Sequence, residues 1–334
     1  MSLTRNDIII GDARTALDAL PGSSVDMVLT SPPYYRLRNY GVDGQLGAES
    51  SVAGWVDELR LIAQAVHRVL TPTGTYWLNV GDTFSARPRE GAPRKSLLLG
   101  PERLALTMVE DGWVLRSRIA WHKPNPVPTS VRDRLTSSWE YIYVFAKQPR
   151  YHFDLDAIRV PHTSAPTRPR QQHQAVAGRE AWRGPNSASA GGLAALKAHG
   201  LVGHPLGKNP SDSWHIAASN YRGSHHATFP IELARRAIAA GCPEARCTVC
   251  RLPWQRPLIR SISAARRGQL APSCTCPPQP EPGLVLDPFM GSGTTAIAAE
   301  ALQRDWLGIE LSPDFAAEAH QRIAGVRPGR QAAA

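Results

Sequence analysis

The sequence predicts an α/β fold built on a Rossmann-like, doubly wound sheet. The first 160 residues alternate short apolar runs, rich in β-forming residues, with segments of helical periodicity. The chain then closes with two more strand–helix units, and a glycine-rich turn follows the strand of the first of them. With 334 residues, 42% of them hydrophobic, the chain is long enough to bury a sizeable core.

The N-terminal half predicts five strands and one long helix. The strands are expected at 7–12, 25–31, 75–81, 114–121 and 141–147. A helix is expected over 51–70, because Leu59, Ile62, Val66 and Leu70 recur at helical spacing and a Pro-Thr-Gly turn follows.

The C-terminal half begins with a change of texture. Residues 159–225 are rich in Pro, Gly, Ser, Ala and His, with eight Lys or Arg against two acids. This composition fits a disordered linker or a nucleic-acid-facing insertion, and both interpretations stay open. A helix is expected over 229–240, and strands near 284–287 and 305–310 bring the number of strands to seven.

The charge of the chain indicates its class of partner. A formal net charge of +10 favours a polyanion, with nucleic acid ahead of a membrane surface, although a solvated basic surface would give the same sum. No apolar run approaches the ~20 residues of a membrane helix, and the N-terminus lacks the order of a signal peptide. We therefore expect a cytoplasmic protein that does not enter membranes.

The turn Phe289–Thr295 has the features of a ligand site. It follows the apolar strand that ends at Asp287, and Gly291 and Gly293 let the backbone approach a ligand closely. The turn opens a helix whose free N–H groups attract a carboxylate. No Lys follows the second Gly, which excludes a phosphate loop, and Gly-x-Gly-x-x-Gly is absent. A zwitterionic amino-acid tail fits, with its ammonium near Asp287 and a ribose near Glu310 at the next strand tip.

The turn Ser31–Tyr34 fits a planar base that carries an exocyclic amino group. Pro32 and Pro33 supply no N–H and leave their carbonyls without local donors. The amino hydrogens would bond to Ser31 and the Pro32 carbonyl, while Tyr34 stacks on the ring of a base flipped out of the helix. A proline-stiffened loop with a surface Tyr is the alternative.

All five cysteines lie between 242 and 276. Cys247-x2-Cys250 and Cys274-x-Cys276 are two short-spaced pairs, typical of a structural Zn²⁺ site with four thiolate ligands. Cys242 is a spare or could replace one ligand. Buried thiols without metal are the alternative.

Together these residues resemble the β-class, circularly permuted, S-adenosylmethionine-dependent DNA amino-methyltransferases. TSPPY at 30–34 is similar to the family's catalytic motif, with Ser31, Pro32, Pro33 and Tyr34 as catalytic residues, and DPFMGSGTT at 287–295 is similar to its cofactor motif. The resemblance implies a seven-stranded sheet in the order 3-2-1-4-5-7-6, with an antiparallel strand. It assigns the cofactor contacts to the following residues: Asp12, Thr30, His226, Thr228, Phe229, Pro230, Asp287, Pro288, Phe289, Gly291, Ser292, Gly293, Thr294, Thr295 and Glu310.

The family also implies the reaction. Its catalytic turn begins with Ser in many cytosine-N4 enzymes and with Asp in many adenine-N6 enzymes, so Ser31 favours N4 of cytosine and adenine N6 stays the alternative. Methyl transfer would be direct and in line, on double-stranded DNA. A homodimer and a restriction endonuclease for the same site are further partners compatible with the family.

The expected organisation follows from these assignments. Residues 1–150 form the catalytic half and 283–325 the cofactor-binding half of one methyltransferase domain, joined by the following segments: a target-recognition region at 151–222, a cofactor-contacting segment and helix at 223–241, a zinc-ribbon-like insertion at 242–282, and a disordered tail at 326–334. Arg168, Arg170, Arg183 and Arg222 are candidate DNA contacts in the recognition region.

Two rival functions remain at this point. An RNA or small-molecule methyltransferase could use the same sheet, although it would not need the SPPY turn with a large basic insertion. A non-catalytic DNA-binding module with a zinc ribbon would explain neither the glycine turn nor Glu310.

Overall fold

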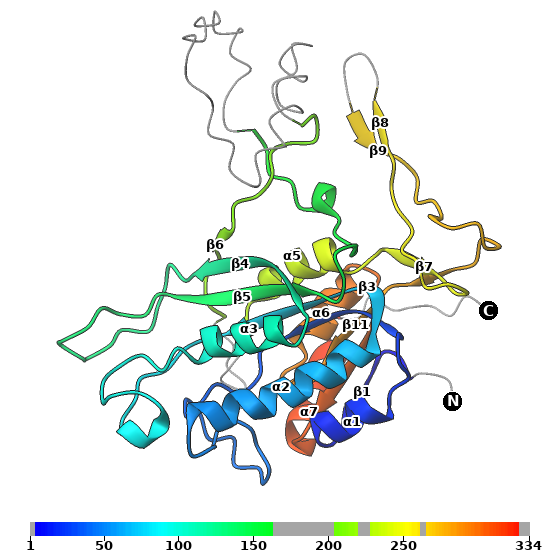
Figure 1. Cartoon of the computed structure of the whole chain (residues 1–334). Coiled ribbons are helices and arrows are strands. Elements are labelled where there is room, and N and C mark those ends of the chain that lie inside the picture. Colours follow the sequence, from blue (N-terminus) through cyan, green and yellow to red (C-terminus); the bar gives the residue numbers. More distant parts are fainter. Residues whose placement is uncertain (1–3, 163–203, 220–227, 261–264, 327–334) are drawn as a thin grey trace, which may run out of the picture. The chain divides into compact units, whose positions relative to one another are not determined.

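A computed structural model describes residues 4–162, 204–219, 228–260 and 265–326 (Figure 1). His226, most of the expected tail, and Arg168, Arg170, Arg183 and Arg222 lie outside the described residues.

The central sheet has eight strands in the described part of the chain, in the order β1-β12-β11-β2-β3-β5-β4-β6. Pairing is parallel from β1 to β3, while β5 runs antiparallel to both β3 and β4. These strands have the following bounds: β1 Asp7–Ile10, β2 Val25–Thr30, β3 Leu70–Val80, β4 Val114–His122, β5 Trp139–Ala146, β6 Ser213–His215, β11 Leu284–Asp287 and β12 Asp305–Glu310. The C-terminal strands β11 and β12 thus lie between the N-terminal strands β1 and β2.

The helices lie on both faces of this sheet (Figure 1). On one face α2 contacts α1 and α3, and on the other α5 contacts α6. The α-helices have the following bounds: α1 Ala13–Ala19, α2 Val52–Val69, α3 Gly100–Glu110, α5 Ile231–Gly241, α6 Thr294–Ala301 and α7 Pro313–Ala324. Two short 3-10 helices, η1 and η2, span Pro88–Glu90 and Leu155–Ala157.

Strand alternation explains how the two layers are filled. Val28, Tyr76 and Leu286 belong to the same buried cluster as the apolar faces of α1, α2 and α3. Their neighbours Met27 and Trp77 point the other way and contact Gly241, at the end of α5. Both faces of the central strands are therefore buried, as expected for a sheet covered by helices.

The observed elements agree with the expected ones except in the number of strands. All seven expected strands are present, with ends at most five residues from their predicted bounds. The helices expected at 51–70 and 229–240, and those expected after the last two strands, are present as well. The prediction of seven strands was wrong by one, since β6 pairs with β4 as an eighth. Strand β6 has only three residues, too few to show an alternation of apolar and polar side chains in the sequence. It forms by pairing with β4 at the edge of the sheet, which the sequence does not reveal.

The chain divides into two compact units. The larger comprises residues 1–154, 211–255 and 270–334, and the smaller comprises 155–210 and 256–269. Within the smaller unit, β8 (Leu258–Arg260) pairs antiparallel with β9 (Ala265–Arg267). Within the larger unit, β7 (Ala245–Cys247) pairs antiparallel with β10 (Pro280–Pro282), just before β11. No described helix combines the length and the apolar character needed to cross a bilayer.

Candidate active site

A cleft of about 1270 Å³ lies at the carboxyl edge of the parallel strands. The turns that follow β2 and β11 line it, together with the end of β12 and the loop that joins β4 to β5. Parallel strands present their carboxyl ends at the same edge, so turns separated by more than 250 residues in sequence meet here. The two motifs singled out in the sequence therefore share one cleft.

The glycine turn after β11 is held in a left-handed backbone conformation. Gly291 and Gly293 have φ of 50° and 78°, which side chains with a Cβ disfavour. A Cβ on Gly293 would lie only 3.1 Å from Ile323 Cδ1 of α7. Arg322, also from α7, donates to the Ser292 carbonyl at 2.8 Å. Helix α7 thus braces the turn that leads into α6.

Asp287 joins the two motifs through buried hydrogen bonds. One carboxylate oxygen accepts from Thr30 Oγ1 at 2.5 Å and from the Phe289 N–H at 3.1 Å. The other oxygen accepts from Thr295 Oγ1 at 2.5 Å. Burial raises the pKa of this carboxyl to about 6, against the lowering effect of its donors. Asp287 fixes the turn, and its expected contact with an ammonium group stays a prediction.

Two further acids lie at neighbouring strand ends. Glu310, the last residue of β12, accepts from the Gly291 N–H at 2.8 Å and from the Ser312 N–H at 2.9 Å. Burial raises the pKa of Glu310 above its usual value. Asp12 follows β1, accepts from the Thr15 N–H at 2.9 Å and caps α1. Both acids line the cleft, so each can reach hydroxyl groups of a ligand.

The two prolines of the turn after β2 differ in the hydrogen bonding of their carbonyls. The Pro33 carbonyl accepts from the indole N–H of Trp55 at 2.9 Å. The Pro32 carbonyl, by contrast, receives no hydrogen bond from the described residues. Pro32 lines the cleft, where a donor on a bound ligand would satisfy this acceptor. This observation fits the expected contact between Pro32 and an amino group.

Tyr34 belongs to a polar network that the sequence analysis missed. Its hydroxyl donates to Glu140 Oε2 at 2.8 Å and accepts from Ser31 Oγ at 3.2 Å. Glu140 is the second residue of β5 and also forms an ion pair with Lys123. Burial and the nearby Glu140 charge raise the pKa of Tyr34 well above its usual value. Asn79 and Glu140 are polar residues in the largely apolar or aromatic strands β3 and β5, and this was the one feature of the sequence that could have identified them as site residues.

Most predicted site residues line the cleft. Those that do are the following: Asp12, Ser31, Pro32, Pro33, Tyr34, Thr228, Phe229, Pro288, Phe289, Gly291, Ser292, Thr294 and Glu310. Thr30, Pro230, Asp287, Gly293 and Thr295 are behind this lining and support it. Tyr40 and Phe315 also line the cleft and were not predicted, because nothing in their local sequence marks them.

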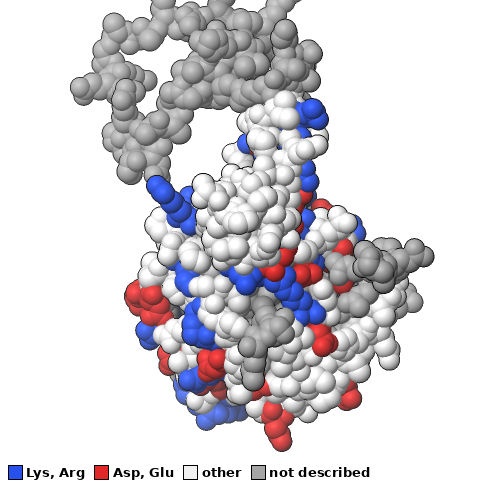
Figure 2. Space-filling view, turned by 90° about the vertical axis from the view of Figure 1, so that its right-hand side faces the viewer, with Lys and Arg blue, Asp and Glu red and all other residues white. Residues whose placement is uncertain are grey.

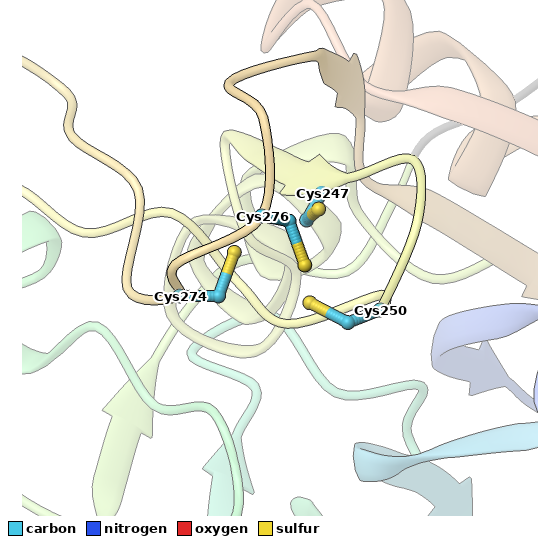
Figure 3. Close-up of side chains that lie close together, drawn as sticks. All are labelled: Cys247, Cys250, Cys274 and Cys276. Carbon is cyan, nitrogen blue, oxygen red and sulfur yellow. The ribbon is translucent and has the colours of Figure 1, made fainter.

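The four paired cysteines lie together away from the cleft. Their Sγ atoms are all within 4.8 Å of one another, and Figure 3 shows the side chains turned toward a common space. Cys247 ends β7, while Cys274 and Cys276 come from the segment that leads into β10. Cys242 is buried separately, with its thiol 3.8 Å from the Pro243 carbonyl. The group can hold a metal ion, and Cys242 is not part of it.

The sequence model of a DNA methylase family, N6_N4_Mtase, matches residues 25–321. The chain belongs to this DNA methylase family. Type II methyltransferase M.SmaI of Serratia marcescens is 32% identical over 95% of this chain and 90% of its own length. Type II methyltransferase M.Cfr9I of Citrobacter freundii is 31% identical over 94% and 86%.

Solved structures bear out the fold of this DNA methylase. The PvuII DNA methyltransferase (cytosine-N4-specific) gives a TM-score of 0.58 at 18% identity, over 98% of this chain and 92% of that one. A putative DNA modification methylase of Thermus thermophilus, solved in complex with S-adenosyl-L-methionine, gives 0.56 at 24% identity, over 97% and 95%. The chain therefore has the mixed α/β methyltransferase fold with a mostly parallel central sheet.

Proposed function

We propose that this DNA methylase transfers a methyl group from S-adenosylmethionine to N4 of cytosine in duplex DNA. The observation that carries the choice of base is Ser31, a neutral residue, at the head of the SPPY turn in the cleft. Ser31 and the Pro32 carbonyl are the two acceptors that an exocyclic amino group would meet there. Methylation of adenine N6 at the same turn is the alternative.

The proposed cofactor lies against the glycine turn. Gly291 and Ser292 would hold its carboxylate end, Glu310 its ribose and Asp12 its adenine side, all of which line one continuous cleft. S-adenosylmethionine supplies an activated methyl group on its sulfonium sulfur. The protein's part is to place the amino nitrogen in line with that group, since proximity and alignment alone can supply much of the rate.

The target base would be flipped out of the duplex to reach the turn. The aromatic face of Tyr34 lines the cleft beside Ser31, and stacking on it would offset part of the unstacking cost. No covalent intermediate is needed, since the described cysteines lie outside both motifs. The acceptors at Ser31 and Pro32 would hold the amino group during transfer.

Analysis of methylated product tests this proposal. Duplex DNA methylated by the protein and digested to nucleosides should yield N4-methylcytosine, whereas N6-methyladenine alone would overturn the choice of base. Ser31→Ala and Tyr34→Ala should abolish transfer and leave cofactor binding within about threefold of wild type by calorimetry. Equal losses of transfer and of cofactor affinity would contradict the role of this turn.

The order of the motifs supports a permuted organisation. The strand before the glycine turn, β11, comes late in the chain and yet lies at the centre of the sheet, between β12 and β2. We assign 1–150 and 283–325 to the two halves of one methyltransferase domain, with 223–241 contacting the cofactor. We assign 151–222 to target recognition. Sequencing of methylated host DNA would identify the target site, and a restriction endonuclease that cuts at this site is a proposed partner. Sedimentation would test whether the protein forms the proposed homodimer.

DNA is the partner that the net charge of +10 favours. The face drawn in Figure 2 carries Lys and Arg side chains interspersed with Asp and Glu, so this face offers no single basic block. Binding to duplex DNA should weaken steeply as salt rises, because phosphate contacts release counterions. A cytoplasmic location goes with this proposal, since the substrate is cellular DNA.

We also propose a structural Zn²⁺ at Cys247, Cys250, Cys274 and Cys276. Zinc–sulfur bonds of ~2.3 Å place the sulfur atoms of a tetrahedral site about 3.8 Å apart, which the observed separations, all within 4.8 Å, approach. Four thiolates leave no open position on the ion, so the metal would hold the insertion at 242–282 together and take no part in methyl transfer.

Metal analysis of the purified protein should find one zinc per chain. Cys250→Ser should lose the metal and lower the melting temperature, while Cys242→Ala, outside the group, should keep a full complement. Wild-type protein with far less than one zinc per chain would overturn the zinc site and leave the methyltransferase proposal untouched.

A further inference from the structure

Methyl transfer to an amino nitrogen leaves a proton to be removed, and Ser31 is a poor acceptor for it. The nitrogen gains a positive charge as its bond to the methyl carbon forms and the carbon–sulfur bond breaks. A neutral hydroxyl can take that proton only if it passes its own proton on. A site that places a neutral Ser beside the amino group therefore needs a base within reach.

The hydroxyl groups beside the turn form a chain that leads to a carboxylate. Ser31 Oγ donates to Tyr34 Oη at 3.2 Å, and Tyr34 Oη donates to Glu140 Oε2 at 2.8 Å. Both hydrogen bonds run in the same direction, from Ser31 toward Glu140, which leaves the Ser31 oxygen able to accept. Ser31, Tyr34 and Glu140 all line the cleft, so the chain begins where the amino group would lie.

Glu140 is held in place from two sides. Asn79 Nδ2 donates to the same Oε2 at 3.3 Å, and Lys123 Nζ forms an ion pair with Oε1. The Lys123 ammonium lies 4.4 Å from the centre of the Trp121 ring, which orients it. The side chains of Lys123 and Glu140 are 20% and 19% exposed, so the pair is shielded from solvent without being sealed from it.

We propose that Ser31, Tyr34 and Glu140 form a proton relay that deprotonates the methylated amino group. This inference rests on the proposed function. The nitrogen gives its proton to Ser31 Oγ, Ser31 passes its own proton to Tyr34 Oη, and Tyr34 passes its own to Glu140. The positive charge on the base is thereby cancelled by the negative charge of Glu140, which later releases the proton to solvent. Tyr34 thus has a role for its hydroxyl besides the stacking of its ring.

A double-mutant cycle on single-turnover methylation tests the relay. Tyr34→Phe keeps the ring and removes the hydroxyl, and Glu140→Gln keeps an acceptor for Tyr34 and removes the base. Each change should lower the transfer rate by about 100-fold, with unchanged affinity for S-adenosylmethionine and for DNA. The double variant should be no slower than either single variant, because both changes interrupt the same path.

Two controls separate a relay from a merely structural role. Glu58→Gln removes an exposed carboxylate of α2 that lies outside the lining of the cleft, and it should keep the wild-type rate. Glu140→Ala, which leaves space for a small carboxylate, should be partly rescued by formate, which a loss of structure would not allow.

The outcomes also distinguish the relay from the function on which it rests. Wild-type protein that methylates no DNA overturns the proposed function itself. Wild-type protein that makes N4-methylcytosine while Glu140→Gln keeps a rate within about threefold of it overturns the relay alone. Multiplying losses in the double variant, or no rescue by formate, would also count against the relay.

Discussion

The ring of Tyr34 packs against Gly81, the residue that follows β3. A Cβ at position 81 would lie 2.8 Å from Tyr34 Cε2, closer than side chains tolerate. The glycine therefore leaves the space that the Tyr34 ring occupies. Neither residue is near the other in sequence, so this dependence follows from the pairing of β2 with β3.

Gly81→Ala should displace the Tyr34 ring and disturb its hydrogen bond to Glu140. We expect methylation to slow at least tenfold, with cofactor affinity unchanged, since the glycine turn lies elsewhere in the cleft. Gly22→Ala is a matched control, because a Cβ there would meet no atom closer than 3.6 Å. Steady-state rates for the two variants measure the effect, and equal rates would contradict it.

Asp287 connects stability to pH through its burial. Its pKa is raised from 3.8 to about 6 in the folded protein, so the folded chain binds a proton more tightly than the unfolded chain. Such a group stabilises the fold at low pH, and this stabilisation is lost as pH rises through about 6. Asp26 behaves in the same direction, with a pKa also raised by burial to about 6.

Asp287→Asn should remove this loss. The free energy of unfolding of wild type relative to the variant should fall by up to about 3 kcal/mol between about pH 4 and pH 7. Asp26 is present in both proteins and cancels in the difference. Urea unfolding at several pH values measures it, and a difference that does not change with pH would refute the assignment.

At the scale of elements, β5 brings Glu140 to the cleft beside Tyr34. It runs antiparallel to β3, with Tyr141 opposite Val80, so its first residues lie at the carboxyl edge of the parallel strands. A parallel strand in this place would put its last residues there instead. The periodicity of 141–147 predicted a strand without its direction, which is why Glu140 was missed.

The first turn of helix α2 contains a glycine, Gly54, that neither the cap nor the packing of the helix requires. Ser51 caps the helix by accepting from the Gly54 N–H at 3.2 Å. Gly54 is helical, and a Cβ on it would lie 3.7 Å from its nearest neighbours, an ordinary contact. The glycine therefore costs conformational entropy without a packing reason.

Gly54→Ala should stabilise the protein by about 0.5–1 kcal/mol. Gly100→Ala, at the start of α3, should not, because its Cβ would approach Trp55 to 3.0 Å. Urea unfolding of both variants gives the comparison. Stabilisation by Gly100→Ala, or none by Gly54→Ala, would show that packing at these helix starts differs from the structure.

At the scale of the whole molecule, Arg246 ties the cysteine-bearing segment to the sheet. Its guanidinium is 1% exposed and forms ion pairs with Asp26 of β2 at 2.7 Å and with Glu281 of β10 at 2.9 Å. It also donates to the Ser24 carbonyl at 2.8 Å. Arg5 reaches the same Glu281 and Asp305 of β12. The strands β7 and β10 are thus held by ion pairs at the amino edge of the sheet.

Arg246→Leu should destabilise the protein by about 3–5 kcal/mol, because it leaves Asp26 buried without its ion-pair partner. Replacing both residues, as Arg246→Leu with Asp26→Leu, should recover much of this loss. Arg60→Leu is the control, since its pair with Asp111 has a 43% exposed arginine and should contribute less than about 1 kcal/mol. Equal losses for Arg246→Leu and Arg60→Leu in urea unfolding would contradict the role of burial.

The sequence by itself determined the seven main strands, the two motifs and the grouping of the cysteines. It could do so because strand alternation, glycine turns and ligand spacing are local patterns within a few residues. Pro32 and Pro33 restrict the backbone angle φ, and Gly291 and Gly293 permit a positive φ, whatever residues they contact in the fold. The family and the class of reaction follow from those motifs.

Only the tertiary structure decided which residues surround the motifs. Strand pairing brings Thr30 to Asp287, Gly81 to Tyr34 and Glu140 to the hydroxyl of Tyr34. Such contacts join residues more than 40 positions apart, and their geometry depends on the order and direction of strands, which periodicity does not contain. The hydrogen bonds that join Tyr34, Asn79 and Glu140 beside Ser31 could therefore not be predicted from the sequence.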